Sequence, residues 1–107
     1  MSVAIETLLA GCLDADEWSV DPVRLALVSS DVYSEGVLAV AVVSPKDKAR
    51  CAAVIGTLTR AGFAIVGRGG GMSYTGGYLP TRPNTVVVDT SRLDRIVEIN
   101  AENLYIT

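Results

Sequence analysis

The residues with the clearest chemical potential form a glycine-rich segment between two apolar runs of the chain. This segment, residues 67–80, reads GRGGGMSYTGGYLP and contains six glycines, small hydroxyl residues and one arginine. Glycine allows positive φ angles and has no Cβ, so backbone amides can approach a ligand closely. Successive amides that point into one concavity bind anions such as phosphate. The segment therefore predicts an anion-binding loop.

The spacing within this loop excludes two common phosphate-binding motifs. No Lys-Ser or Lys-Thr pair follows the glycines, as a P-loop requires, and no helix-forming segment follows them, as a dinucleotide fingerprint requires. Pro80 and Pro83 prevent a helix directly after the loop. A flexible surface turn is the simpler alternative for a glycine-rich stretch. Apolar runs at 63–66 and 85–88 border the loop, however, and a loop held at both ends favours a binding or packing role.

The composition favours one small domain whose side chains can do little chemistry by themselves. The chain has 107 residues, no histidine and a formal net charge of −3. Histidine is the commonest metal ligand and general base, so we expect no metal site and infer that any chemistry comes from a cofactor. The basic residues form no run, and this argues against a nucleic-acid partner, which needs a clustered basic face.

The two cysteines and the N-terminus bear on the compartment. Cys12 and Cys51 lie among apolar neighbours, too far apart in sequence for a metal-binding knuckle. We expect buried free thiols in a reducing compartment, and therefore a cytoplasmic protein, while a single disulfide stays open. Residues 1–13 are apolar but include Glu6 and lack the basic start and cleavage site of a secretion signal. No segment is long enough to span a membrane.

Apolar periodicity predicts two short elements at the start of the chain. Residues 3–13 have near-helical spacing and indicate a short helix. Asp21 and Pro22 are typical of a helix start and favour a helix over 23–29, although the apolar residues there also suit a strand. Both alternatives stay open for this second element.

A strand, a helix and a strand lead into the glycine loop. The β-branched run 37–43 predicts a central strand covered on both faces. Ser44 as N-cap and Pro45 in the first turn indicate that a helix begins there, and Gly62 is the expected C-cap. Residues 63–66 then predict a second strand. The default arrangement of such a unit is a right-handed crossover between parallel strands.

Further strands follow the loop. Residues 85–89 predict a covered strand, 91–94 a turn, 96–99 a strand, 100–103 a tight turn and 104–107 the start of another strand. The sequence stops within this last apolar element, so we expect a piece of a longer protein. Together the elements predict an α/β (α+β) fold, a small parallel β-α-β sheet with flanking helices.

The order of these features carries a resemblance to a known family. The chain has an apolar strand, Pro45, an amphipathic helix, Gly62-Phe63 and a second strand. These are followed in order by GRGGGMSYTGG, TVVVD, SRL and IVEI. This order resembles the FAD-binding domain of the vanillyl-alcohol oxidase and p-cresol methylhydroxylase superfamily, nearest to FAD-linked glycolate and D-lactate oxidoreductases. The resemblance implies the first half of a two-subdomain FAD-binding fold. Residues 1–36 would be a helical lead-in and 37–107 the first subdomain, incomplete at its C-terminus.

In that family the glycine loop holds the FAD pyrophosphate, chiefly through backbone amides. Carried over by position, the cofactor-binding residues are Arg68, Gly69, Gly70, Gly71, Met72, Ser73, Gly76 and Gly77. Several members have a histidine bonded covalently to the flavin where this chain has Met72, so the resemblance implies non-covalent FAD. An ordinary strand-end role for Arg68 is an equal alternative. We interpret Asp89, Glu98 and Glu102 as surface or turn residues, and we assign no catalytic residue.

The resemblance implies the pyrophosphate-binding portion of a flavin-dependent oxidoreductase that oxidises a small 2-hydroxy acid. Its implied partners are the remainder of the FAD-binding domain and a substrate domain. The alternative is a truncated, cofactor-free α/β fragment that acts as an interaction module. Its exposed apolar edge at 104–106 would pair with the rest of the polypeptide or with a second copy, giving a homo-oligomer. A binder of another nucleotide or sugar phosphate is a third alternative, because amides recognise phosphate in general.

Overall fold

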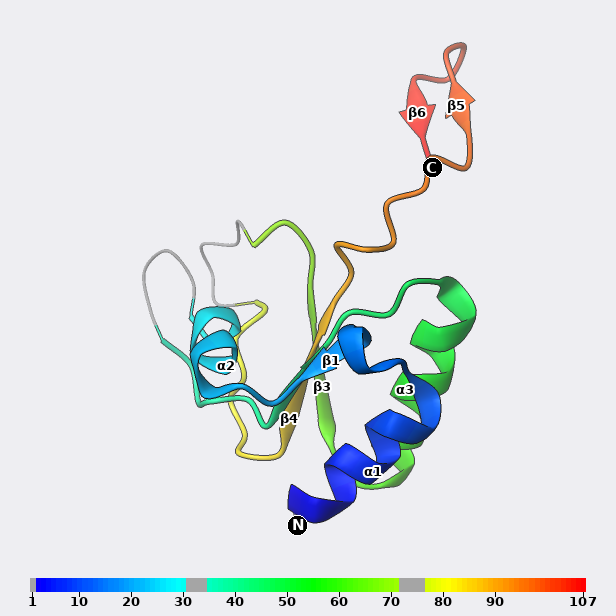
Figure 1. Cartoon of the computed structure of the whole chain (residues 1–107). Coiled ribbons are helices and arrows are strands. Elements are labelled where there is room, and N and C mark those ends of the chain that lie inside the picture. Colours follow the sequence, from blue (N-terminus) through cyan, green and yellow to red (C-terminus); the bar gives the residue numbers. More distant parts are fainter. Residues whose placement is uncertain (1, 31–34, 72–76) are drawn as a thin grey trace.

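The computed structural model describes residues 2–30, 35–71 and 77–107. It contains a four-stranded sheet with helices on both faces and a separate two-stranded hairpin (Figure 1). The strands of the sheet are β1 (Trp18–Ser19), β2 (Ala41–Val43), β3 (Ala64–Arg68) and β4 (Thr85–Asp89), in the order β1-β2-β4-β3. Strands β2 and β3 are parallel to β4, whereas β1 is antiparallel to β2. The predicted α/β class is confirmed, and the sheet is mixed, with three parallel strands and one antiparallel edge strand.

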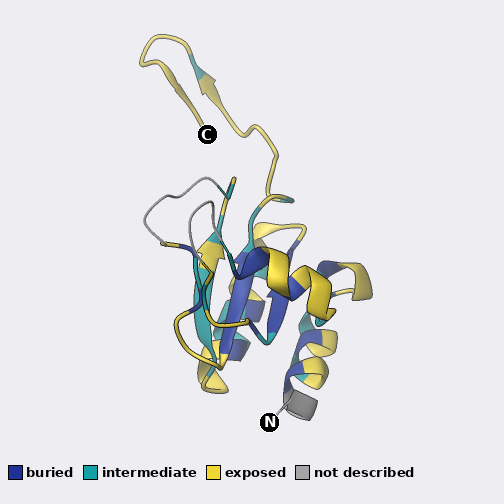
Figure 2. Ribbon diagram, turned by 90° about the vertical axis from the view of Figure 1, so that its left-hand side faces the viewer, coloured by how far each residue is buried: buried dark blue, intermediate teal, exposed yellow. Residues whose placement is uncertain are grey.

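Alternate residues of the central strands point to opposite faces, and each face is covered by helices. Helices α1 (Ser2–Cys12) and α3 (Lys48–Arg60) pack on one face and helix α2 (Pro22–Val28) on the other (Figure 1). The first core contains Ile5, Leu9, Leu13, Ala41, Val43, Val54, Leu58, Val86 and Val88, and the second contains Leu25, Val28, Ala39, Val42 and Val87. Burial on both faces explains why β2 and β4 are nearly all β-branched. The buried strands lie between the helices in Figure 2.

Helix α2 settles the alternative that the sequence left open for residues 23–29. The Asp21 side chain accepts a hydrogen bond from the Arg24 amide at 3.3 Å, and Pro22 occupies the first turn. A side-chain N-cap followed by proline stabilises the start of a helix. The helix is therefore correct and the strand is wrong.

The predicted N-cap of helix α3 is wrong, and the helix begins three residues later than expected. Asp47, not Ser44, is the N-cap, and its side chain accepts a hydrogen bond from the Arg50 amide at 2.8 Å. Ser44 is buried, and its hydroxyl accepts a hydrogen bond from the Arg24 guanidinium at 3.3 Å. At the other end Ala61 is the C-cap, and Gly62 follows with a φ of 92°. The predicted C-cap is therefore wrong by one position, although a glycine with positive φ directly after the C-cap still ends the helix.

Strand β2 is shorter than the predicted 37–43. The Val37 amide donates to the Pro80 carbonyl at 2.9 Å, and the Ala39 amide donates to the Ser29 hydroxyl at 3.0 Å. Because these amides bond to loop and helix-end residues, residues 37–39 lie outside the sheet, whereas the Val40 amide still donates to the Thr85 carbonyl of β4 at 2.9 Å. Only Ala41–Val43 remains, and it lies in the interior of the sheet as predicted.

The C-terminal residues form an antiparallel hairpin that stands away from the sheet (Figures 1 and 2). Its strands are β5 (Ile99–Asn100) and β6 (Tyr105–Ile106), joined by the predicted turn. The strand predicted over 96–99 is thus shorter and displaced. Most of the apolar side chains here are exposed, including Ile99 at 66% and Ile106 at 68%. Nothing within the described part of the chain covers this hairpin.

Candidate functional site

The glycine loop begins at the edge of the sheet where the parallel strands end. Strands β2, β3 and β4 are parallel, so the segments that follow Val43, Arg68 and Asp89 lie at one edge (Figure 1). In open α/β sheets, ligands bind outside the carboxyl ends of the strands. The fold therefore places the start of the loop where a ligand is expected.

Three loop glycines have backbone amides available for a ligand. Among the residues that the structure describes, the amides of Gly69, Gly70 and Gly71 donate no hydrogen bond. A Cβ added at Gly69 or Gly70 would meet no atom within 4 Å, whereas Gly71 has a φ of 72°. Open space beside unpaired amides fits an anionic group such as a diphosphate.

The Arg68 side chain folds back beneath the start of the loop. Its Nη1 lies 3.5 Å from the carbonyl oxygens of Val28 and Ser30, at the C-terminal end of α2. Its guanidinium carbon lies 4.4 Å from the centre of the Tyr78 ring. A Cβ on Gly71 would lie 2.9 Å from Arg68 Nη2. The guanidinium is therefore held between the end of α2, the Tyr78 ring and Gly71.

The segment that returns from the loop is fixed against the body of the domain. Tyr78 is 6% exposed, and its hydroxyl donates a hydrogen bond to the Gly71 carbonyl at 2.9 Å. Pro80 accepts a hydrogen bond from the Val37 amide, and a Cβ at Gly36 would lie 2.6 Å from the Pro80 carbonyl oxygen. The absence of a side chain at Gly36 thus allows the return segment to approach.

The predicted cofactor residues divide into two groups in the structure. Gly69, Gly70 and Gly71 lie together after β3, and Gly77 is exposed in a turn before Tyr78. The other three predicted residues lie outside the described part of the chain: Met72, Ser73 and Gly76. Their roles in binding stay predictions.

Sequence reasoning missed Tyr78 as a residue of this site. In the sequence, Tyr78 was noted only as part of the segment before Pro83 that cannot form a helix. Its position seven residues after Gly71 gives no local signal, because the contact arises when the loop closes on itself. A tyrosine next to a glycine-rich loop was the one available indication, since buried tyrosine hydroxyls usually need a polar partner.

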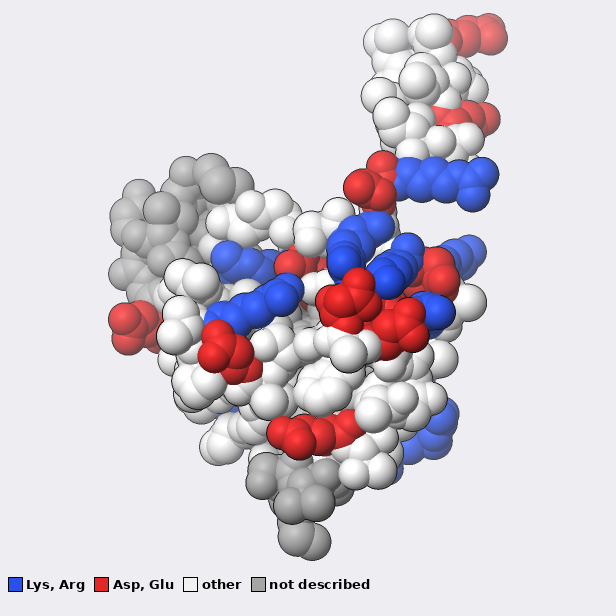
Figure 3. Space-filling model, viewed as in Figure 1, with Lys and Arg blue, Asp and Glu red and all other residues white. Residues whose placement is uncertain are grey.

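A second polar cluster lies at the same edge of the sheet. It joins Asp14, Asp16 and Glu17 to Lys46, Arg50 and Arg92 through ion pairs. Figure 3 shows acidic and basic side chains intermingled there. Carboxylate oxygens of the three acids lie within 4.8 Å of one another, a spacing that suits a cation. Basic side chains already pair with these acids, so we interpret the cluster as structural.

Glu17 is the buried centre of this cluster, in the 3₁₀ turn η1 (Ala15–Glu17) before β1. Its side chain is fully buried and accepts hydrogen bonds from the amides of Asp14 and Lys46, each at 2.9 Å, and from Arg50. Burial raises the pKa of Glu17, but the two amides and the guanidinium outweigh this effect, so the pKa lies below its usual 4.5. The carboxylate is thus charged and satisfied.

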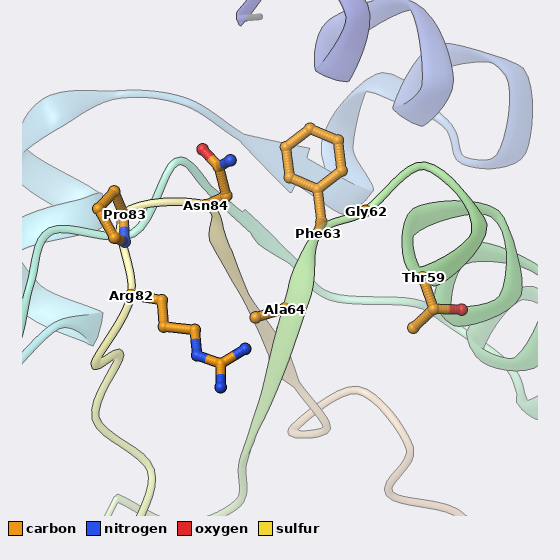
Figure 4. A pocket seen from close by; sticks show the side chains of 7 residues that line it. All are labelled: Thr59, Gly62, Phe63, Ala64, Arg82, Pro83 and Asn84. Atoms are coloured by element: carbon orange, nitrogen blue, oxygen red, sulfur yellow. The ribbon is translucent and has the colours of Figure 1, made fainter.

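Two cavities lined by described residues lie away from Gly69–Gly71. The larger, about 460 Å³, lies at the opposite end of β3 and β4 (Figure 4). Its lining residues are Thr59, Gly62, Phe63, Ala64, Arg82, Pro83 and Asn84. The smaller, about 190 Å³, lies beside the end of α2 and includes Ser29, Glu35 and Gly36. Neither cavity is lined by the glycines predicted to bind phosphate.

The sequence also predicted buried free thiols and no segment long enough to span a membrane. Cys12 and Cys51 are free, as expected, but each is half-buried rather than buried. The Cys12 thiol donates to the Thr57 hydroxyl at 3.5 Å. In the described residues, every helix is too short or too polar to cross a lipid bilayer.

Comparison with known proteins identifies the class of this domain. Residues 39–107 match the family described as FAD binding domain. This match spans more than half of the sequence, so the chain belongs to that family, and FAD is the cofactor of the family. The resemblance to the FAD-binding domain of the vanillyl-alcohol oxidase and p-cresol methylhydroxylase superfamily is confirmed.

A solved structure supports the fold independently. A variant of Physcomitrella patens BBE-like 1 is similar, with a TM-score of 0.71 and 21% sequence identity over 89% of this chain. The chain spans only 20% of that structure's chain. At this identity the likeness shows the fold alone. No curated protein sequence matches the chain.

Proposed function

We propose that this chain binds the diphosphate of FAD through the backbone amides of Gly69, Gly70 and Gly71. The observation that carries the proposal is that these amides, at the carboxyl edge of a parallel sheet, donate to no described partner. A diphosphate needs several convergent donors, and glycine amides supply them without a helix N-terminus. Ser73 would add a hydroxyl donor, and Gly76 and Gly77 the second bend of the cradle.

The parent protein is proposed to be a flavin-dependent oxidoreductase. FAD supplies the redox chemistry when bound, and the protein positions it. Membership of the FAD-binding family supports this role for the chain. A small 2-hydroxy acid as the substrate rests on the sequence resemblance alone.

The partners and compartment are part of the same proposal. The remainder of an FAD-binding domain and a substrate domain would cover the exposed β5–β6 hairpin, whose apolar residues include Ile99 and Ile106. A homo-oligomer formed through the hairpin is the competing way to cover it. Free thiols at Cys12 and Cys51 support a reducing, cytoplasmic location.

An FAD titration tests the diphosphate proposal. Trp18 is the single tryptophan of the chain, so quenching of its fluorescence by added FAD reports binding. Gly70→Ala places a methyl group in open space, so the fold should be unchanged while the ligand is crowded. We expect this variant to weaken FAD binding by about tenfold or more, or about 1.4 kcal/mol.

Gly67→Ala is the matched control for this titration. Gly67 is the first residue of the glycine-rich segment but lies within β3, before Gly69–Gly71, and a Cβ there also meets no atom within 4 Å. Its FAD affinity should equal that of the wild type. The titration is repeated with the full gene product, followed by flavin fluorescence. If FAD binds neither form, the proposed function is wrong.

A further inference from the structure

The glycine loop is closed by contacts between residues at its two ends. Arg68 and Gly71 precede the loop's middle, and Tyr78 follows it. The Tyr78 hydroxyl donates to the Gly71 carbonyl at 2.9 Å, and the Arg68 guanidinium lies 4.4 Å from the Tyr78 ring centre. One buried aromatic residue therefore joins both sides of the loop's base.

The same guanidinium ties the base of the loop to helix α2. Val28 is the last residue of α2, and the carbonyl groups at a helix end have no partner within the helix. Arg68 Nη1 lies 3.5 Å from the carbonyl oxygens of Val28 and Ser30. A cation at this end of a helix is also favoured by the helix dipole. Arg68 thus links the loop, the Tyr78 ring and α2.

The positive charge of Arg68 is not neutralised within the described part of the chain. The ion pairs there involve Lys46, Arg50 and Arg92, and no described carboxylate pairs with Arg68. Carbonyl oxygens and a tyrosine ring hold a cation in place, but they are neutral groups and do not cancel its positive charge. That charge lies directly behind Gly71, since a Cβ there would touch Arg68 Nη2.

We propose that Arg68 and Tyr78 are positioning residues that hold the base of the glycine loop in the conformation that binds a diphosphate. In this arrangement Arg68 attracts the anion from behind the loop, and the amides of Gly69–Gly71 make the contacts. The inference rests on the proposed function and adds the residues that preorganise its site. A loop already closed at its base loses less conformational entropy when it binds a ligand.

Gly71 suits this arrangement for two separate reasons. Its φ of 72° disfavours residues with a side chain, and a Cβ there would lie 2.9 Å from Arg68 Nη2, so the guanidinium would have to shift. Gly69 and Gly70 have neither constraint. The glycines of the loop therefore differ in role, with Gly71 serving the closed base and the other two serving access to their amides.

Titrations with FAD, ADP and riboflavin test the proposal in the full gene product. FAD and ADP contain a diphosphate, whereas riboflavin has no phosphate. Tyr78→Phe removes only the hydroxyl, and we expect it to weaken FAD and ADP binding by about fivefold, the effect of one hydrogen bond. Tyr105→Phe is the matched control, because Tyr105 lies in β6, away from the start of the glycine loop (Figure 1). Riboflavin affinity should be the same in all forms.

The charge of Arg68 is tested by the salt dependence of ADP binding. Arg68→Met should weaken ADP binding and flatten its dependence on salt, because screening then acts on one cation fewer. Arg68→Lys keeps the charge, so it should restore the salt dependence although it loses the planar guanidinium. Arg82→Met, at the opposite end of the sheet, changes the net charge equally and should leave both properties unchanged.

The possible outcomes separate this inference from the proposed function. If the wild type binds no FAD, the proposed function fails and takes the inference with it. If the wild type binds FAD but Tyr78→Phe binds equally well, the hydroxyl does not preorganise the loop. An unchanged salt dependence in Arg68→Met overturns the electrostatic role. Should Arg68→Met fail to fold, Arg68→Lys decides, because loss of the wild-type salt dependence there contradicts the proposal.

Discussion

The carboxylate of Glu17 accepts a hydrogen bond from the backbone amide of Lys46 at 2.9 Å, although the two residues lie 29 positions apart. The Glu17 carbonyl also accepts a bond from the Ser44 amide at 2.6 Å. The turn before β1 is thereby joined to the chain between β2 and α3. This buried acid fixes the edge of the sheet that also carries the glycine loop.

Glu17→Gln should destabilise the domain strongly. In glutamine an NH₂ group replaces one of the two carboxylate oxygens. This NH₂ donor would face either the Lys46 amide or the Arg50 guanidinium, and both of these groups are donors too. Disrupting such a buried charged group costs about 3–5 kcal/mol. Urea denaturation measures the change in the free energy of unfolding. Glu102→Gln, on the exposed hairpin turn, should change it by less than about 0.5 kcal/mol, and equal losses in both variants would contradict the role of Glu17.

Stability should fall as the pH drops below about 4.5. Hydrogen bonds from Arg50 lower the pKa of Asp14, and those from Lys46 lower the pKa of Asp16, from usual values of 3.8. The pKa of Glu17 is also lowered, from 4.5. A group with a lowered pKa in the folded state contributes stability above its usual pKa and loses it as the pH falls through the lowered value. Thermal unfolding between about pH 7 and about pH 3 should show this loss, and Glu17→Gln should show a weaker pH dependence.

Gly36→Ala and Gly11→Ala should change stability in opposite directions. A Cβ at Gly36 would lie 2.6 Å from the Pro80 carbonyl oxygen, so the return segment of the loop must move. We expect a loss of about 1–3 kcal/mol, as for other overpacked sites. A Cβ at Gly11, in α1, meets no atom within 4 Å, and alanine there should add up to about 1 kcal/mol. Chemical denaturation of both variants checks this, and stabilisation by Gly36→Ala would show that the close approach is absent.

Much of this fold could be predicted from the sequence because its central strands are covered on both faces. The runs around Val42 and Val87 are β-branched for that reason, and the pattern predicted both strands, although β2 is shorter than the predicted 37–43. Ser44 was predicted as the N-cap of α3 because local spacing allowed it. The structure uses Asp47, since Ser44 is instead buried in contact with Arg24. Local patterns cannot reveal contacts with residues twenty positions away.

The candidate site shows the same division. Gly69–Gly71 could be predicted because glycine composition reflects a local backbone requirement. Tyr78 and Arg68 meet only after the loop closes, and Glu17 reaches Lys46 only after β1 pairs with β2. Side chains whose partners are set by tertiary structure carry no spacing signal. The sequence therefore indicated the backbone that we propose to bind the ligand, and Arg68 beside it, but not the contact between Arg68 and Tyr78.

Hydrogen exchange should divide the chain into a stable sheet and an unstable hairpin. The β4 residues Val86 and Val87 are fully buried between two neighbouring strands. Strands β5 and β6 pair only with each other, and Ile106 is 68% exposed. An uncovered two-stranded hairpin is marginally stable in water. We expect the β4 amides to exchange slowest and the β5–β6 amides to show little protection in the isolated chain, and equal protection would mean that the hairpin is covered.

Flavin bound by the full gene product should be released when the protein is unfolded. The chain has Met72 where several members of the family carry a histidine bonded to FAD. Methionine has no imidazole nitrogen and so cannot form that bond. Acid precipitation should leave the yellow cofactor in the supernatant and a colourless pellet. Met72→His is the informative variant, because it restores the residue type used for attachment in those relatives. Flavin retained in the wild-type pellet would mean that another residue forms a covalent bond, and the proposed non-covalent attachment would then be wrong.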